Sequence, residues 1–414
     1  MKGRILLRAG FRYQTRNFIH ESKLKDTSLH IDWLDELRGF AVLFVLAYHC
    51  LFWPFKSTHL PWNESGVLRS FDVPTGFLLV SPVTLGWGGV AIFFVISGFC
   101  IHLSHLKEPT FGIFFWKRFW RICPPYFITV FMFFVSDLLL HQIDKSDGAF
   151  QLVTHLLMIH NFWTDSRFGI NPSFWSIAVE AQLYLIYPIL LLLQRLFGWK
   201  TTIGIALFLE FMLKQGAYTL SLHGIVMPQT LTQGPFAYWC SWSIGAWMAD
   251  KYKRRKALNW PRLLSPITCT LLVLATWIYK PISPLEFLAV ALLCASVIAW
   301  KLTPIILRPC ATPRRNSGIE DRILVNLRRY LAFIGIISYS LYLLHQPIIS
   351  LMNKLLTLAP FYRELPTLLQ YFTLLVVTLM VSLPSAYVFH VLIERTSITW
   401  GKQLWQRLAH KTLA

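Results

Sequence analysis

The sequence predicts an all-α protein that crosses a membrane many times. Of its 414 residues, 55% are hydrophobic and only 14% are charged, whereas about a quarter of the residues of a soluble domain are charged. The 17 tryptophans and 32 phenylalanines suit lipid-facing surfaces and the membrane–water interface. About ten apolar stretches approach the 20 residues that a helix needs to span a bilayer. Together these observations exclude a soluble globular domain.

The expected spans follow one another with short connections. The seventh and eighth are separated only by the turn Lys280–Pro284, where two prolines interrupt the apolar run. No internal repeat and no separate soluble domain interrupts the series. The ten spans are expected at approximately 34–55, 83–106, 123–141, 173–195, 201–220, 233–250, 263–279, 284–302, 330–352 and 368–392.

The distribution of lysine and arginine gives the chain an orientation. If the N-terminus is cytoplasmic, 31 of the 39 basic residues fall inside and 8 outside, as the positive-inside rule requires. We therefore expect a membrane domain over 34–396, between a basic cytoplasmic segment at 1–33 and a basic cytoplasmic tail at 397–414. The same bias accounts for the net charge of +19, so no nucleic-acid partner is expected. Residues 107–122, in which Phe and Trp are mixed with Lys and Arg, are expected to form an interfacial helix.

The cysteines and the paired histidines show no pattern of a disulfide or metal site. The seven cysteines lie mostly inside apolar runs without paired spacing. The pairs His102/His105 and His155/His160 have no carboxylate or cysteine to complete a metal site, so solvated or interfacial positions are expected for them. The first 30 residues are basic and lack an apolar core, so no cleavable signal peptide is expected. Neither a metal nor a bound cofactor is predicted.

The first span carries two ionisable residues, Arg38 and His49. Eleven residues separate them, which is about 16 Å of helical rise and brings them to within about 20° of one face. Ionisable groups inside a bilayer are costly, so such a pair indicates a functional site. The alternative is that His49 is only a hydrogen-bonded contact between helices.

Three ionisable residues of different spans lie at a similar expected depth. His49, Glu180 and His345 are each six or seven residues from the outer end of their helix, about 10 Å below the outer boundary. They would form a buried acid/base cluster if their helices are neighbours. The alternatives are a carboxylate satisfied by a neighbouring helix for Glu180, and a cap on the kink at Pro347 for His345.

Arg118 and Arg121 are three residues apart and share a helix face. Paired guanidinium groups near the cytoplasmic surface suit phosphate recognition. The competing interpretation is an ordinary basic anchor that binds lipid headgroups.

These polar residues lie in six short strings of the sequence. In chain order the strings are Asp35–His49, FFVISGF at Phe93–Phe99, Arg118–Arg121 followed by Pro124 and Pro125, Phe174–Pro188, Ile337–Pro347 and Leu392–Arg395. In composition and order they resemble the motifs of the acyltransferase-3 family, whose integral membrane members O-acylate glycans and other acceptors. The resemblance extends over about 34–396, nearly the whole chain.

The chain departs from the family pattern in two places. Thr396 stands where the family often has Pro, which affects only the expected end of the last helix. Some members carry a fused soluble esterase-like domain after the membrane part. No such domain is expected here because the sequence ends at Ala414, so a second acyl-handling step would need a partner.

The resemblance implies roles for the polar residues. Arg38 and His49 would be essential to catalysis, and Glu180 is a further catalytic candidate in a motif position of less settled role. Arg118 and Arg121 would engage the acyl donor, expected to be acyl-coenzyme A from the cytoplasm. Motif positions of less settled role are also held by Asp35, Ser97, His345 and Glu394.

The sequence thus leads to one hypothesis and one rival. The hypothesis is an O-acyltransferase of the bacterial inner membrane that moves an acyl group, expected to be acetyl, to a hydroxyl of a cell-surface glycan such as lipopolysaccharide O-antigen or exopolysaccharide. His49 would act as general base or as a transient acyl carrier. The rival is a proton-coupled secondary transporter or exporter in which His49, Glu180 and His345 relay protons. A lipid, peptidoglycan or small-molecule acceptor is a third alternative.

Overall fold

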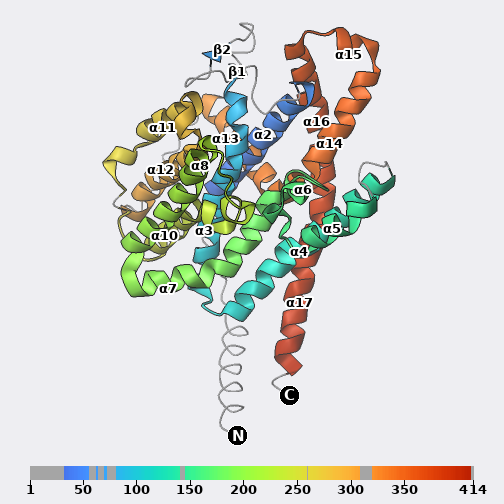
Figure 1. Cartoon of the computed structure of the whole chain (residues 1–414). Helices are drawn as coiled ribbons and strands as arrows, with labels where there is room; N and C mark the ends of the chain where they lie inside the picture. The colour runs from blue at the N-terminus through green and yellow to red at the C-terminus, as the bar shows by residue number, and fades with distance from the viewer. Residues whose placement is uncertain are drawn as a thin grey trace.

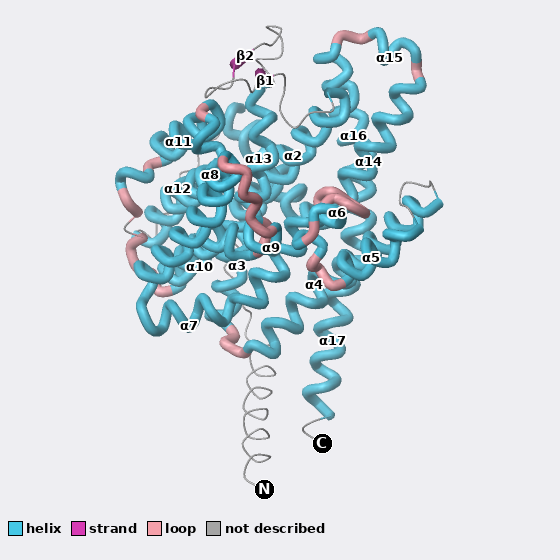
Figure 2. The backbone as a smooth tube through the Cα atoms, viewed as in Figure 1, coloured by secondary structure: helices cyan, strands magenta, loops and turns pink. Residues whose placement is uncertain are grey.

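The computed structural model describes residues 32–55, 62–63, 70–71, 81–139, 145–258, 260–307 and 319–411. Helices make up most of this part of the chain (Figures 1 and 2), and two short strands, β1 (Trp62–Asn63) and β2 (Ser70–Phe71), pair antiparallel. The predicted all-α, polytopic membrane fold is confirmed.

The α-helices are labelled in Figure 1. Their bounds are α2 (Asp32–Phe55), α3 (Gly89–Lys107), α4 (Phe111–Leu139), α5 (Lys145–Leu156), α6 (Thr164–Arg167), α7 (Phe174–Phe211), α8 (Ala217–Leu222), α9 (Gln229–Thr232), α10 (Trp239–Lys253), α11 (Pro266–Ile278), α12 (Glu286–Leu307), α13 (Ile319–Ile336), α14 (Ser338–Leu358), α15 (Pro360–Glu364), α16 (Thr367–Phe389) and α17 (Arg395–Lys411). Short 3₁₀ segments lie at Ser81–Gly88, His160–Phe162, Pro235–Tyr238, Arg262–Leu264 and Lys280–Leu285, and π-helical turns at Met212–Gly216 and His390–Glu394.

Several helices are long and apolar enough to cross a membrane. Among the described residues there are five such segments, or six if one bent pair counts as a single span. The five are Pro82–Lys107, Phe111–Leu139, Phe174–Leu222, Lys280–Thr303 and Thr367–Ala409. The total of ten spans and the cytoplasmic position of both termini stay predictions.

Within the segment expected as an interfacial helix at 107–122, Lys107 ends α3 and residues 111–122 are the first part of α4, which continues without a break to Leu139. Pro124 and Pro125 lie inside this helix, and Pro124 cannot donate to the carbonyl of Trp120 four residues before it. The hydroxyl of Ser397 donates to that carbonyl instead. Because Ser397 belongs to α17, the segment predicted as a tail is here a helix that packs against α4.

The expected ninth span, 330–352, is two helices rather than one. Residues Ile323–Ile336 of α13 and Ser338–Leu358 of α14 meet at an angle of 78°. α13 turns away because it packs along α2, where a Cβ on Gly335 would lie 1.9 Å from the carbonyl oxygen of Asp35. A continuous apolar run cannot reveal this bend, since both halves are apolar.

A second close crossing joins α3 to α10. A Cβ on Gly98 would lie 2.0 Å from the carbonyl oxygen of Trp242, and one on Gly245 would lie 1.9 Å from that of Val95. Real Cβ atoms do not approach backbone this closely, so only glycine allows the two helices to touch. The crossing fixes the helix face that carries Ser97.

His155 and His160, expected in solvated or interfacial positions, are fully buried. The two rings stack with centroids 3.9 Å apart and planes 7° from parallel. His155 Nδ1 donates to the carbonyl of Gln151 at 2.7 Å, because a carbonyl only accepts. The expectation was wrong because the short helix α5 folds back against α4, where the Tyr126 hydroxyl donates to the His155 carbonyl.

We expect Gly98→Ala and Gly245→Ala to destabilise the protein. Each added methyl group would collide with backbone of the partner helix, and overpacking of this kind costs about 1–3 kcal/mol or more. Gly204→Ala is the matched control, because nothing lies within 4 Å of its Cβ position and alanine is the better helix former. Thermal unfolding in detergent should show lower midpoints for the first two variants and an unchanged or higher one for the control. Equal midpoints in all three would contradict the close crossing.

The buried histidine stack predicts acid sensitivity. Burial lowers the pKa of His155 to about 4 and holds the pKa of His160 well below 6.5. The unfolded chain therefore binds more protons than the folded one as pH falls from about 6.5 towards 4, and stability is lost over that window. For His155 the loss is about 3 kcal/mol, at 1.36 kcal/mol per pKa unit.

His155→Phe keeps an aromatic ring against His160 and removes one of the two titrating groups. Between pH 7 and pH 4.5 the variant should lose about 2–3 kcal/mol less stability than the unmodified protein. Thermal unfolding at several pH values measures the difference. Identical pH profiles would show that His155 does not titrate on unfolding.

Candidate active site

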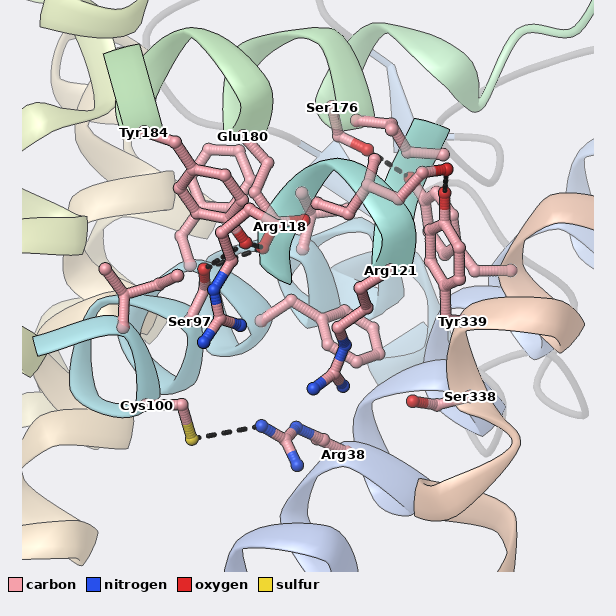
Figure 3. A pocket seen from close by; sticks show the side chains of 17 residues that line it. Arg38, Ser97, Cys100, Arg118, Arg121, Ser176, Glu180, Tyr184, Ser338 and Tyr339 are labelled. Carbon is pink, nitrogen blue, oxygen red and sulfur yellow. Dashed lines mark hydrogen bonds between the residues drawn. The ribbon is translucent and has the colours of Figure 1, made fainter. Parts of the chain in front are cut away.

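A cavity of about 110 Å³ lies where α2, α3, α4, α7 and α14 meet. It has room for several water molecules or for the end of an extended chain. The five helices come from distant parts of the sequence, and each contributes residues of one motif string or its immediate neighbour. The polar side chains that line the cavity (Figure 3) are Arg38, Ser97, Cys100, Arg118, Arg121, Ser176, Glu180, Tyr184, Ser338, Tyr339 and Tyr342.

Three arginines point into this cavity from two helices (Figure 3). Arg38 comes from α2, and Arg118 and Arg121 come from successive turns of α4. Arg38 Nη1 donates to Asp35 Oδ1 at 2.6 Å and Nη2 donates to Cys100 Sγ at 3.1 Å, which fixes its position. The Nε of Arg118 is buried, and the described part of the chain offers it no hydrogen-bond partner. Three guanidinium groups with one lining carboxylate give the cavity an excess of positive charge, which suits an anion such as phosphate.

The lining carboxylate is Glu180, on α7 beside Arg118 (Figure 3). Ser97 Oγ donates to Glu180 Oε1 at 2.6 Å, and the Tyr184 hydroxyl donates to the same oxygen. Trp242 Nε1 in turn donates to Ser97 Oγ at 3.3 Å. The carboxylate is therefore held in one orientation by donors from α3 and from the next turn of its own helix.

The two intramembrane histidines form a pair. His49 Nδ1 lies 3.1 Å from His345 Nε2, and the ring centroids are 5.0 Å apart. His345 is fully buried, whereas His49 is partly exposed. The predicted juxtaposition of these two residues across α2 and α14 is observed, but Glu180 hydrogen-bonds to Ser97 and Tyr184 rather than completing a cluster with them.

The hydrogen bonds around His345 determine where the protons lie in the neutral pair. His345 Nδ1 is 2.7 Å from the carbonyl oxygen of Tyr342, which can only accept, so Nδ1 carries the hydrogen. Nε2 of a neutral His345 must then accept, and the two groups near it are His49 Nδ1 at 3.1 Å and Ser173 Oγ at 3.3 Å. When His49 Nδ1 is the donor, Nε2 of His49 keeps its lone pair. This is the arrangement of an imidazole that can take a proton.

A row of hydroxyl groups connects the cavity to the histidine pair. Ser176, which lines the cavity, has its Oγ 2.7 Å from the Tyr342 hydroxyl, and that hydroxyl donates to the Ser173 carbonyl at 3.2 Å. Ser173 Oγ lies 3.3 Å from His345 Nε2. The Tyr342 ring also contacts the His345 ring, with centroids 5.3 Å apart. The side chains of Tyr342 and His345 therefore separate the arginine-lined cavity from His49.

Ser173 is positioned by a proline on the facing helix. Pro347 in α14 cannot donate to the carbonyl of Leu343, and Asn171 Nδ2 donates to it at 3.1 Å instead. Asn171 Oδ1 accepts from the backbone N–H of Ser173 at 2.9 Å. The proline that suggested a kink near His345 thus provides the attachment point for the start of α7.

Glu394 lies outside the cavity and has a different environment. It is buried, accepts from Ser340 Oγ at 2.7 Å and lies 2.9 Å from His390 Nδ1. It therefore ties the π-helical turn before α17 to the first turn of α14, next to the lining residues Ser338 and Tyr339.

Sequence reasoning missed several residues of this site. Tyr184 follows Glu180 by four residues, a spacing that places both on one helix face and would have indicated it. Ser173, Ser176 and Tyr342 carry no comparable signal, because a hydroxyl in an apolar helix is common and its partners lie on another helix.

Comparison with known proteins identifies relatives of this chain. The family model of the "Acyltransferase domain" of the acyltransferase-3 type matches residues 31–389. The protein named "Putative O-acetyltransferase SACOL0978" of Staphylococcus aureus (strain COL) is 27% identical over 193 residues, which are 43% of this chain and 27% of that protein. "Putative peptidoglycan O-acetyltransferase YrhL" of Bacillus subtilis (strain 168) is 28% identical over 181 residues, 39% of this chain and 24% of that one.

A third relative, "Acyltransferase MdmB" of Streptomyces mycarofaciens, is 28% identical over 163 residues, 38% of either chain. The chain thus spans about a quarter of the length of the first two relatives. No solved structure matches it significantly. Because the family model covers far more than half of the residues, the chain belongs to the acyltransferase-3 family of membrane proteins.

Proposed function

We propose that this protein is a membrane O-acyltransferase that moves an acetyl group from acyl-coenzyme A to a hydroxyl of a cell-surface glycan. The observation that carries the proposal is a cavity with three arginines that hydroxyl side chains connect to a histidine pair, in which His49 can act as a base. Membership of the acyltransferase-3 family supports the reaction class. The three arginines disfavour the alternative of a proton-coupled transporter, because such a transporter needs no anion site of this kind.

The donor enters at the arginines. Phosphate groups of coenzyme A bind Arg38, Arg118 and Arg121, because guanidinium groups match phosphate in charge and geometry. Glu180 stays fixed by Ser97 and limits the positive charge of the site. The thioester arm extends from there towards the histidine pair. By the positive-inside rule, this end of the protein faces the cytoplasm of the bacterial inner membrane, where acyl-coenzyme A is available.

His49 activates the acceptor. Its Nε2 takes the proton of the acceptor hydroxyl while the oxygen attacks the thioester carbonyl carbon, forming a C–O bond. The C–S bond then breaks, and the leaving sulfur takes the proton back from His49, so the products are an ester and a free thiol. His345 accepts a hydrogen bond from His49 Nδ1 and holds the imidazole in this tautomer.

The acceptor is proposed from the relatives and from membrane geometry. Relatives named as O-acetyltransferases, one of them for peptidoglycan, favour acetyl as the acyl group and a glycan as the acceptor. His49 lies about 16 Å of helical rise beyond Arg38, which leaves the far side of the protein for the acceptor. Mass spectra of surface glycans from cells with and without the gene test both points, and the absence of any acyl-sized mass difference would refute a glycan acceptor.

Replacement of His49 should remove most of the activity. His49→Ala is expected to lower the rate of transfer from acetyl-coenzyme A by about 10²–10⁴-fold, the usual contribution of a general base. His345→Ala should lower the rate by a smaller factor, because it keeps His49 as the base and removes only the residue that orients it. His223→Ala, at an exposed loop position, is the control. A purified His49→Ala protein with the native rate would exclude the catalytic role.

Mass spectrometry of the purified protein distinguishes a role of His49 as general base from a role as acyl carrier. If His49 Nε2 itself took the acyl group, incubation with donor alone would add one acyl mass to the protein, and His49→Ala would lose that adduct. We expect no such adduct from intact-protein mass spectrometry of the unmodified enzyme.

Replacement of the arginines should weaken donor binding. Arg118→Gln and Arg121→Gln are each expected to raise the KM for acetyl-coenzyme A by roughly 10-fold or more, as for loss of a charge-assisted hydrogen bond worth about 1.5–3 kcal/mol. Arg262→Gln, at an exposed position away from the cavity, is the control. If both variants kept the native KM at low and at high salt, the donor would bind elsewhere.

A further inference from the structure

A second cavity, of about 240 Å³, lies between α4 and α17. Arg118 and Arg121 line both this cavity and the first one, so the two cavities share these two side chains. The second cavity is also lined by three tryptophans and two lysines: Trp116, Trp120, Trp405, Lys117 and Lys402. Aromatic walls combined with cationic groups suit a ligand with a flat ring and attached phosphates.

The tryptophans are held in place by contacts between the two helices. Trp116 Nε1 donates to the Gly401 carbonyl at 2.8 Å, and its ring centroid is 5.8 Å from that of Trp405. Gly401 packs so closely on Trp120 that a Cβ would lie 2.4 Å from the indole ring. The Ser397 hydroxyl binds the Trp120 carbonyl. The tryptophans that line the second cavity are thus held in position by contacts between α4 and α17.

Two buried donors at this cavity have no partner in the described part of the chain. They are Nε1 of Trp120 and Nε of Arg118. Buried polar groups are nearly always hydrogen-bonded in folded proteins. Both residues line the second cavity, so its wall includes side chains with polar groups that the protein itself does not satisfy.

The cavity lies where a water-soluble ligand can reach it. α16, the π-helical turn and α17 form one helical segment, Thr367–Ala409, of 43 residues. At 1.5 Å per residue it is about 65 Å long, roughly twice the 30 Å hydrocarbon core of a bilayer. Much of α17 therefore projects beyond the membrane, as its extension past the helix bundle in Figure 1 illustrates.

We propose that this second cavity binds the nucleotide end of the acyl donor. The inference rests on the proposed function and adds a subsite to it. The base stacks on indole rings of Trp116 and Trp405, Lys402 contacts a phosphate, and Arg118 and Arg121, which line both cavities, bind the phosphates. The thioester arm continues from these arginines into the first cavity. α17 is then part of the donor site.

Donors with and without a nucleotide test the subsite. Trp405→Ala should raise the KM for acetyl-coenzyme A by about 10-fold, since stacking of a base on an aromatic ring is typically worth that much or more. Lys402→Ala should raise it severalfold. For S-acetyl-pantetheine, which lacks the nucleotide, neither variant should change the KM, and kcat should stay the same for both donors. Gln403→Ala, an exposed neighbour on α17 that does not line the cavity, is the control.

Direct binding provides a readout that does not depend on catalysis. Adenosine 3′,5′-bisphosphate should quench the tryptophan fluorescence of the purified protein, and Trp405→Ala should weaken its binding by a similar factor. Thermal unfolding verifies that the variants are folded. If the nucleotide does not bind, or if anionic phospholipid vesicles occupy the site while the nucleotide does not, the subsite is refuted.

The two proposals fail in different ways. Equal losses with both donors in the Trp405→Ala protein would overturn the nucleotide subsite while leaving the acyltransferase intact. Nucleotide binding that depends on Trp405, in a protein that transfers no acyl group from any donor to any glycan, would overturn the function and keep the subsite.

Discussion

Positive charge inside an apolar helix bundle is the constraint on which this site depends. Arg38, Arg118 and Arg121 share a cavity with one lining carboxylate, that of Glu180. Burying a charge without a partner is expensive. Arg38 is paired with Asp35, whereas the buried Nε of Arg118 has no hydrogen-bond partner in the described part of the chain. An anionic ligand, such as the phosphorylated donor that we propose, would supply the missing negative charge. The same logic explains why Glu180 is held by two hydroxyl groups: a mobile carboxylate would pair with an arginine and close the site.

Part of the arrangement of the site can be predicted from the sequence, because the position of a residue along a membrane-spanning helix sets its depth in the bilayer. The spacing of Arg38 and His49 in the sequence predicted that they share a helix face. The equal expected depth of His49 and His345 is consistent with the distance of 3.1 Å between His49 Nδ1 and His345 Nε2. Depth does not predict, however, which helices are neighbours in the plane of the membrane. Glu180 lies at a similar expected depth but on a helix face that meets α3, where the glycine crossing with α10 brings Ser97 and Trp242 to it. Those neighbours depend on backbone contact between helices, which apolar runs do not encode.

The features that the sequence did not predict share one physical origin. The bend of 78° between α13 and α14, the unbroken course of α4 and the packing of α17 are all decided by contacts between segments distant in the chain. The buried stack of His155 and His160 is a further case, because burial of a short polar helix depends on what covers it. Local pattern predicts which segments are helical and apolar, whereas their directions depend on a few close contacts.

Two prolines show how such contacts arise. Pro124 leaves the carbonyl of Trp120 without its helical donor, and Pro347 does the same to Leu343. A buried carbonyl without a partner costs about 1–3 kcal/mol, and in each case a side chain from another segment donates to it: Ser397 of α17 and Asn171 before α7. The first bond brings α17 to the arginines, and the second brings Ser173 to His345. The two prolines therefore act as attachment points for the arginine side and the histidine side of the same site.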